Sequence, residues 1–109
     1  MRKALILIHG KPAAVLTEQP DRGWEVAYLP GYHGEPVSLS LPVRDAKRRY
    51  PGFPAFLDNL LLEGAMLEAF LQKHKVDQDD CFTQLVMLGE DLAGALTVRK
   101  LHSGDEDTP

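Results

Sequence analysis

The sequence is poor in the residues that build disulfide frameworks and metal sites. Its single cysteine, Cys81, allows no internal disulfide, so the chain lacks the framework typical of small secreted domains. The four histidines show no close metal-ligand pairing: His9, His33, His74 and His102. The apolar run Ala4–Ile8 is too short for the hydrophobic core of a signal peptide and far too short to span a bilayer. We therefore expect a cytoplasmic protein that does not enter a membrane.

Positive charge is also scarce. The chain has 12 Lys and Arg against 16 Asp and Glu, and its net charge is −4. This balance disfavours direct binding to nucleic acid or to an anionic membrane, because both depend on cations that neutralise phosphates. With 44% hydrophobic and 26% charged residues over 109 positions, the composition is typical of one globular domain. We place this domain at residues 1–102 and expect a disordered acidic tail at residues 103–109.

The motifs of common catalytic and phosphate-binding sites are missing as well. Gly10-Lys11 lacks the upstream glycine and the following Ser or Thr of a P-loop, and no protein-kinase, GxSxG or HExxH motif occurs. The aspartate-rich run at residues 77–80 lacks the glycine and the terminal glutamate of a calcium loop. We therefore expect no catalytic residues, no metal and no cofactor, and we do not expect an enzyme.

What the sequence does contain is a strand-rich first half. The continuous apolar run Ala4–Ile8 predicts a strand buried on both faces, and Ala13–Thr17 predicts the returning strand of a hairpin. Trp24–Leu29 and the alternating run Val37–Leu41 predict two further strands, so the first four form a meander. Ala95–Leu101 predicts a final strand.

Two helices are predicted in the second half. The first covers about Leu60–His74 and carries a wide apolar stripe, although Gly64 inside it lowers helix stability. The second covers about Gln78–Leu88, with Asp77 as a suitable N-cap and Gly89 as its C-terminal glycine. The expected fold is α+β, with a small antiparallel sheet of about five strands packed against two helices.

A basic cluster occupies Arg44–Arg49. One interpretation is a solvated connection between structural elements. The other is a patch that meets an acidic partner or a phosphate, which the flanking aromatic residues Tyr50 and Phe53 would suit.

Two segments resemble a known family. Phe53-Pro54-Ala55-Phe56-Leu57-Asp58-Asn59-Leu60-Leu61-Leu62-Glu63-Gly64 is similar to the F-x-x-L-L-P-E-G motif of the N-terminal subdomain of HipA-type toxin kinases. Leu88-Gly89-Glu90-Asp91-Leu92-Ala93-Gly94-Ala95-Leu96 is similar to the family's G-x-D-x-x-G-A motif, and the resemblance reaches to about Leu101. The family's kinase core lies beyond this subdomain. A stand-alone copy resembles the small subunit of HipBST toxin–antitoxin systems, HipS, which neutralises the kinase HipT.

The resemblance implies a partner-binding surface around the first motif. The candidate residues are Arg48, Tyr50, Phe53, Phe56, Asp58, Asn59, Glu63, Gly64, Ala65 and Met66. Leu62 stands where many relatives have proline, and Ala65 stands where they carry a bulky residue, often tryptophan. If that bulky side chain meets the kinase, Ala65 removes an anchor and weakens inhibition. The alternative is that Phe53, Phe56, Leu60 and Met66 belong to the core.

Three functions remain open at this level. The first is an antitoxin that binds and inhibits a HipA-like kinase, in a ternary complex with a helix-turn-helix HipB-like subunit that binds DNA. The second is a non-inhibitory supporting lobe of a split HipA-like kinase. The third is a small nucleic-acid adaptor that uses Arg44–Arg49, which the net charge disfavours.

Overall fold

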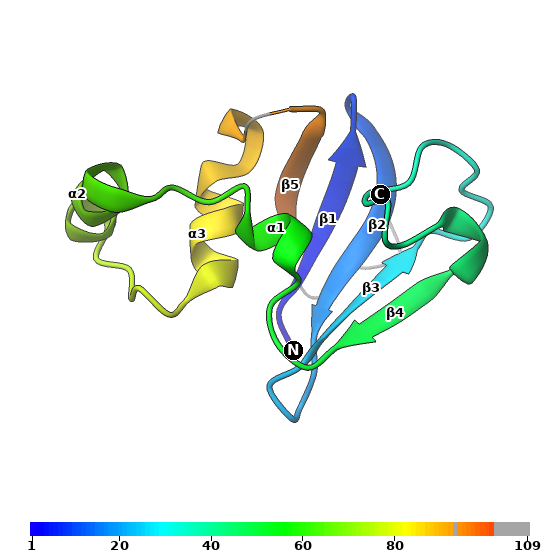
Figure 1. Ribbon diagram of the computed structural model, residues 1–109, viewed down its shortest axis with the longest axis horizontal. Coiled ribbons are helices and arrows are strands. Elements are labelled where there is room, and N and C mark those ends of the chain that lie inside the picture. The colour runs from blue at the N-terminus through cyan, green and yellow to red at the C-terminus, as the bar shows by residue number, and fades with distance from the viewer. Residues whose placement is uncertain (93, 102–109) are drawn as a thin grey trace.

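The computed structural model describes residues 1–92 and 94–101. It confirms an α+β fold in which a five-stranded antiparallel sheet carries the short helix α1 and the longer helix α3 in front of one face (Figure 1). A third helix, α2, lies beyond α3 at one end of the molecule (Figure 1). The molecule is therefore elongated, with principal extents of 40 × 30 × 26 Å.

The strand order in the sheet is β4-β3-β2-β1-β5. The first four strands form a meander, of which the first three were predicted, and the last strand of the sheet lies beside the first. Their bounds are Lys3–Ile8 for β1, Lys11–Glu18 for β2, Trp24–Tyr28 for β3, Lys47–Tyr50 for β4 and Leu96–Leu101 for β5. The edge strand β4 is short and rich in cations, which discourages pairing with a further strand.

The three α-helices differ in length and in burial. Their bounds are Ala55–Asp58 for α1, Gly64–His74 for α2 and Cys81–Leu88 for α3. Helix α1 buries Leu57, and α3 buries Phe82, Gln84 and Leu85, but α2 has no buried residue. Short 3-10 turns occur at Val43–Asp45 and Gly89–Asp91.

The core lies between one face of the sheet and helices α1 and α3. Alternate residues of β1, β2 and β3 form the side of the core that the sheet contributes, since successive side chains of a strand point to opposite faces. Trp24 lies at the centre of an aromatic group: Phe53 meets it edge to face at 5.2 Å between centroids, and Phe82 stacks on it at 5.6 Å. The core joins these buried residues of the sheet and helices: Ala4, Ile6, Ile8, Ala14, Leu16, Trp24, Val26, Leu57, Phe82 and Leu85.

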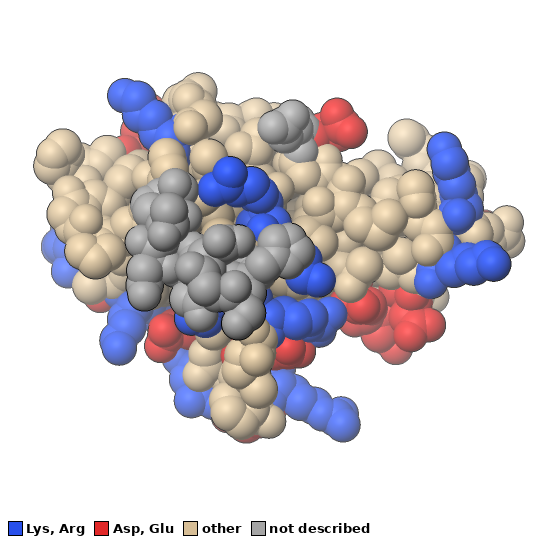
Figure 2. Space-filling model, turned by 180° about the vertical axis from the view of Figure 1, so that it is seen from behind, with Lys and Arg blue, Asp and Glu red and all other residues tan. Residues whose placement is uncertain are grey.

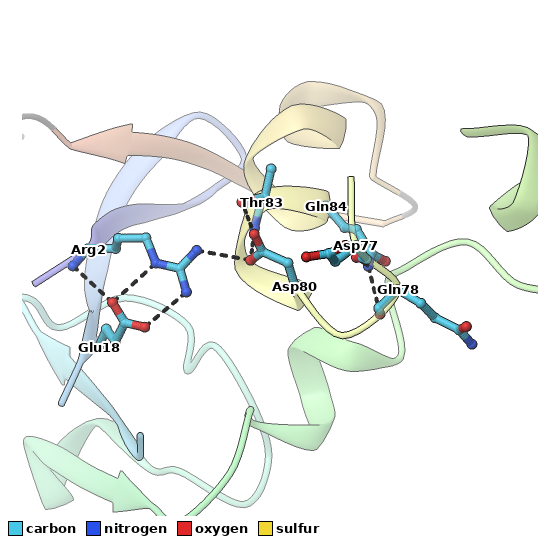
Figure 3. A network of polar contacts seen from close by, with 7 residues as sticks. All are labelled: Arg2, Glu18, Asp77, Gln78, Asp80, Thr83 and Gln84. Atoms are coloured by element: carbon cyan, nitrogen blue, oxygen red, sulfur yellow. Dashed lines mark hydrogen bonds and ion pairs between the residues drawn. The ribbon is translucent and has the colours of Figure 1, made fainter. Parts of the chain in front are cut away.

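Arg2 joins the sheet to the start of α3 (Figure 3). Its guanidinium group donates hydrogen bonds to Glu18 Oε2 and to Asp80 Oδ1, both at 2.9 Å. Asp80 is the N-cap of α3, where its carboxylate accepts from the Thr83 amide and hydroxyl. The prediction of Asp77 as the N-cap was therefore wrong by one turn, and Asp77 instead offers its carbonyl oxygen to the buried Gln84 side chain.

The predicted strand Val37–Leu41 was wrong. This segment is a loop that bends back on itself, with an isolated bridge between Ser38 and Leu41. Val37 and Leu41 are buried, but Leu39 is 96% exposed at the tip. The Tyr28 hydroxyl holds both arms of the loop, because it donates to the Leu41 carbonyl and accepts from the Val37 amide.

The fourth strand is instead Lys47–Tyr50, which falls largely within the basic cluster interpreted as a connection. The helix predicted over about Leu60–His74 begins only at Gly64, and a separate short helix, α1, precedes it. The second helix begins at Cys81 rather than at about Gln78. The start of the final strand was predicted to within one residue. The predicted tail, residues 103–109, lies outside the described residues.

Candidate partner-binding site

Two sets among the candidate residues between Arg48 and Met66 lie in different parts of the molecule. The aromatic members lie against the core beside the sheet. The members near α2 are exposed and lie at the far end of the molecule (Figure 1). The sequence motif therefore combines a part that packs on the core and a part that is exposed.

The aromatic group anchors the segment that leads to α2. Phe53 packs on Trp24, and Tyr50 lies 6.4 Å from Phe56 between ring centroids. Phe53, Phe56 and Leu60 are partly buried against the core. The core interpretation thus describes Phe53 and Phe56 well, but it does not describe Met66, which is 68% exposed.

The polar candidates in and beside α1 have local roles. Arg48 donates to the Ser40 carbonyl at 2.8 Å, so part of the basic cluster braces the loop that carries Leu39. Asn59 caps the end of α1 through its backbone amide, which donates to the Ala55 carbonyl. Asp58 is exposed at the last position of α1.

Helix α2 is apolar and yet carries no buried residue. Six of its 11 residues are apolar, namely Ala65, Met66, Leu67, Ala69, Phe70 and Leu71. Leu67, Phe70 and Leu71 are half-buried, although none of them is among the side chains that pack on the core, whereas Ala65, Met66 and Ala69 form the exposed outer side. A surface helix normally buries its apolar stripe, so α2 has the composition of a helix that packs on something else.

Gly64 sets the direction in which α2 leaves the preceding chain. Its φ of +59° lies in the left-handed region, and a Cβ atom at this position would have no neighbour within 4 Å. Gly64 is therefore required by backbone conformation and not by a close approach. Glu63 precedes it as the N-cap residue in an extended conformation, without a capping hydrogen bond from its side chain. At the other end, Lys75 also has a positive φ, of 55°.

Reactive chemistry finds little support at this site. Burial raises the pKa of the Cys81 thiol, and the carboxylates of Asp58, Asp80 and Asp79 raise it further, so the thiol stays protonated and unreactive. Over residues 1–92 and 94–101, no cluster of three or more His, Cys, Asp or Glu could hold a metal ion. In the same part of the chain, no helix is long and apolar enough to cross a membrane.

Sequence reasoning missed the features that separate α2 from the domain. It expected this helix to pack against the sheet, because the apolar pattern of an exposed helix equals that of a buried one. The residues around Arg2 in the sequence do not predict its ion pairs, since its partner Asp80 lies 78 residues away. The signal that was available is Gly64, which points to a special backbone conformation at the start of α2.

Comparisons with known proteins agree with this geometry. A family model described as the HipA N-terminal domain matches residues 4–99. An uncharacterized protein of Haemophilus influenzae is 26% identical over 100 residues, which covers 92% of this chain and 93% of that protein. A solved structure of the N-terminal domain of HipA toxin superposes with a TM-score of 0.74 at 22% identity, covering 94% of each chain, and shares the fold. The chain belongs to the HipA N-terminal domain family.

Proposed function

We propose that this protein is an antitoxin subunit that binds a HipA-like kinase toxin and lowers its activity. The observation that carries the proposal is the exposed helix α2, whose apolar residues include Met66 at 68% exposure and none that is buried. Membership in the HipA N-terminal domain family supports a kinase as the partner. No catalytic role is assigned to the chain in this proposal.

The docking surface consists of the outer side of α2 and the residues that lead into it. Helix-in-groove recognition uses apolar side chains one turn apart, and Ala65 and Ala69 on the exposed side have this spacing. The small side chains at Ala65 and Ala69 allow a close approach of the partner, while Met66 provides an adaptable apolar contact. Burying this surface on the kinase removes apolar area from water, which drives association.

Inhibition then follows from differential binding. A module that binds the inactive arrangement of the kinase more tightly than the active one shifts the population toward the inactive state. In the proposed complex, DNA binding belongs to a separate helix-turn-helix subunit.

The test measures phosphorylation by the cognate HipA-like kinase with and without this protein in stoichiometric amount. The proposal expects a clear fall in rate and a stable complex by size-exclusion chromatography. A rise in rate would instead identify a supporting lobe of a split kinase. The absence of any complex would overturn the proposal.

Two matched substitutions sharpen this test. Met66→Glu places a charge in the proposed interface and should abolish the complex, whereas Met87→Glu changes a residue on α3 that is 44% exposed and should leave it intact. Both variants should melt like the parent protein, because neither side chain is buried. Equal loss of binding in both variants would contradict docking through α2.

A third substitution tests the depth of inhibition. Ala65 is exposed, so Ala65→Trp adds an aromatic anchor without disturbing the core and should strengthen inhibition. Leu39→Trp adds the same side chain at a position that is 96% exposed and outside α2, and it should have no effect.

A further inference from the structure

The sheet has a second face that helices α1 and α3 do not cover. Alternation along β1 directs Ala4, Ile6 and Ile8 into the core, so Leu5 and Leu7 lie on the opposite face. Among the described residues, this face carries no helix. The side chains on this face therefore indicate the chemistry of a partner that would bind there.

One row of this face crosses the whole sheet. The strand registers align Arg99 with Leu5, Leu5 with Val15, Val15 with Ala27, and Ala27 with Lys47. The row has three apolar residues at its centre and one cation on each edge strand. Leu5 is already buried, but Val15 and Ala27 are only half-buried and both cations are exposed. With strands about 4.8 Å apart, the two cations stand on strands separated by about 19 Å.

The neighbouring row adds charge of the same sign. It aligns Lys3 with Thr17, Thr17 with Glu25, and Glu25 with Arg49. Glu25 is the one acidic residue of these two rows, and Arg49 forms an ion pair with Asp21. Lysine and arginine side chains are prominent on this side of the molecule (Figure 2). The face is thus positive in a chain whose net charge is −4.

A hollow lies at the β1–β5 end of the face. It has a volume of about 320 Å³ and is lined by Leu7, Gly10, Thr97, Val98 and Arg99. Gly10 leaves one side open, because a Cβ atom there would meet nothing within 4 Å. The hollow therefore offers space for one apolar side chain beside a guanidinium group.

We propose that this face binds an acidic protein segment, with apolar residues at its centre and carboxylates toward both ends. The apolar middle of the row matches the centre of such a segment, and Arg99 and Lys47 match its ends. A protein segment fits better than nucleic acid, because these rows carry no aromatic side chain on which a base could stack. This surface is separate from α2, so its failure would leave the proposed kinase docking untouched.

The test uses a synthetic peptide with Val-Leu-Val at its centre and two acidic residues at each end, followed by amide NMR shifts of the full chain. Shifts should concentrate on the alternate residues Leu5, Leu7, Val15 and Ala27. Arg99→Glu should lower the affinity for the peptide about tenfold, since it replaces attraction by repulsion at the edge strand β5. Lys100→Glu is the matched control: it is the exposed neighbour on β5 with the opposite orientation, paired with Ala4, and it should leave affinity unchanged.

Several outcomes would overturn the proposal. If Arg99→Glu and Lys100→Glu lower the peptide affinity equally, the effect comes from the net charge of the protein and not from this face. Binding of phosphatidylserine vesicles, but not of the peptide, would assign the face to a membrane. If the peptide binds only after Asp105, Glu106 and Asp107 are replaced by serine, the occupant is the chain's own acidic segment and not a partner.

Discussion

Arg2 and Asp80 form an ion pair at 2.9 Å although 78 residues separate them in the sequence. The same guanidinium group lies 4.9 Å above the centre of the Phe82 ring and 5.8 Å from that of Trp24. It therefore connects the first strand, the N-cap of α3 and the aromatic centre of the core. This relationship gives the first two predictions.

Arg2→Ala should lower the free energy of unfolding by about 1–2 kcal/mol. The change removes hydrogen bonds to two carboxylates as well as the contact with the aromatic rings. Urea unfolding of both proteins at neutral pH measures the difference. Lys73→Ala, an exposed position on α2, serves as the control and should change stability by less than about 0.5 kcal/mol. An Arg2 variant as stable as the parent would contradict the role of this contact.

Stability should fall in acid through the same group of residues. The hydrogen bonds from Arg2 lower the pKa of Glu18. Burial alone would raise the pKa of Asp80, but hydrogen bonds from Thr83 and Arg2 outweigh it and lower that pKa as well. Because both folded-state pKa values lie below the unfolded ones, the stabilisation is complete above the usual carboxyl range and is lost as the pH falls through the folded-state values.

The measurement is the urea midpoint of the parent and of Arg2→Ala at neutral pH and near pH 3. The parent should lose more stability on acidification than the variant, because in the variant Arg2 no longer lowers the pKa values of Glu18 and Asp80. An identical loss in both proteins would assign the acid effect to other groups.

Two glycines with positive φ should respond differently to alanine. At Gly64 the cost is backbone strain alone, about 1 kcal/mol, because a Cβ atom would find open space. At Gly89, with a φ of +43°, a Cβ atom would also lie 3.3 Å from the Val98 carbonyl oxygen. Gly89→Ala should therefore destabilise more than Gly64→Ala in thermal melts. The reverse order would show that α3 and β5 adjust easily at this contact.

The loop that replaced the predicted strand gives a matched pair. Leu41 is fully buried, so Leu41→Ala should lower stability by about 2–5 kcal/mol. Leu39, two residues earlier, is 96% exposed, and Leu39→Ala should be nearly neutral. Chemical denaturation of both variants checks this. Similar values would mean that the segment behaves as a strand with both leucines on one face.

Tyr50→Phe should maintain or raise stability. The Tyr50 hydroxyl is buried and has no hydrogen-bond partner among the described residues, and burial raises its pKa. Removing an unsatisfied buried hydroxyl costs nothing in lost hydrogen bonds and can gain up to about 1 kcal/mol. A clear loss in the melting temperature would reveal a partner for this hydroxyl, such as the Arg48 guanidinium group, which partly offsets the rise that burial causes in the pKa of Tyr50.

The sequence allowed the fold class, the meander and the final strand to be predicted, because β1 is a continuous apolar run and β3 alternates from Trp24. It misplaced the fourth strand for a physical reason. Val37–Leu41 alternates like a strand but lacks a neighbour, whereas Lys47–Tyr50 is polar and pairs with β3 at the sheet edge. Pairing is a tertiary property, and an edge strand needs little apolar character.

The sequence motif named the candidate residues, but it did not predict how they are arranged in space. Motif resemblance brought Phe53 and Met66 into one group, yet the first packs on Trp24 and the second faces solvent. Helix α1, the segment after it and the left-handed backbone at Gly64 separate the two environments, and a sequence does not state a dihedral angle. The aromatic part of the motif thus packs on the core, and the part from Glu63 to Met66 is exposed.

The pairing of β5 with β1 has a consequence for biosynthesis. Ala4 leaves the ribosome long before its partner Lys100 is synthesised. Until then, one edge of the most apolar strand has no neighbour, and it presents free backbone groups to any other extended chain. Newly made protein therefore depends on its last strand to close this edge, and chains that stop short of residue 96 should be strong candidates for aggregation and proteolytic clearance.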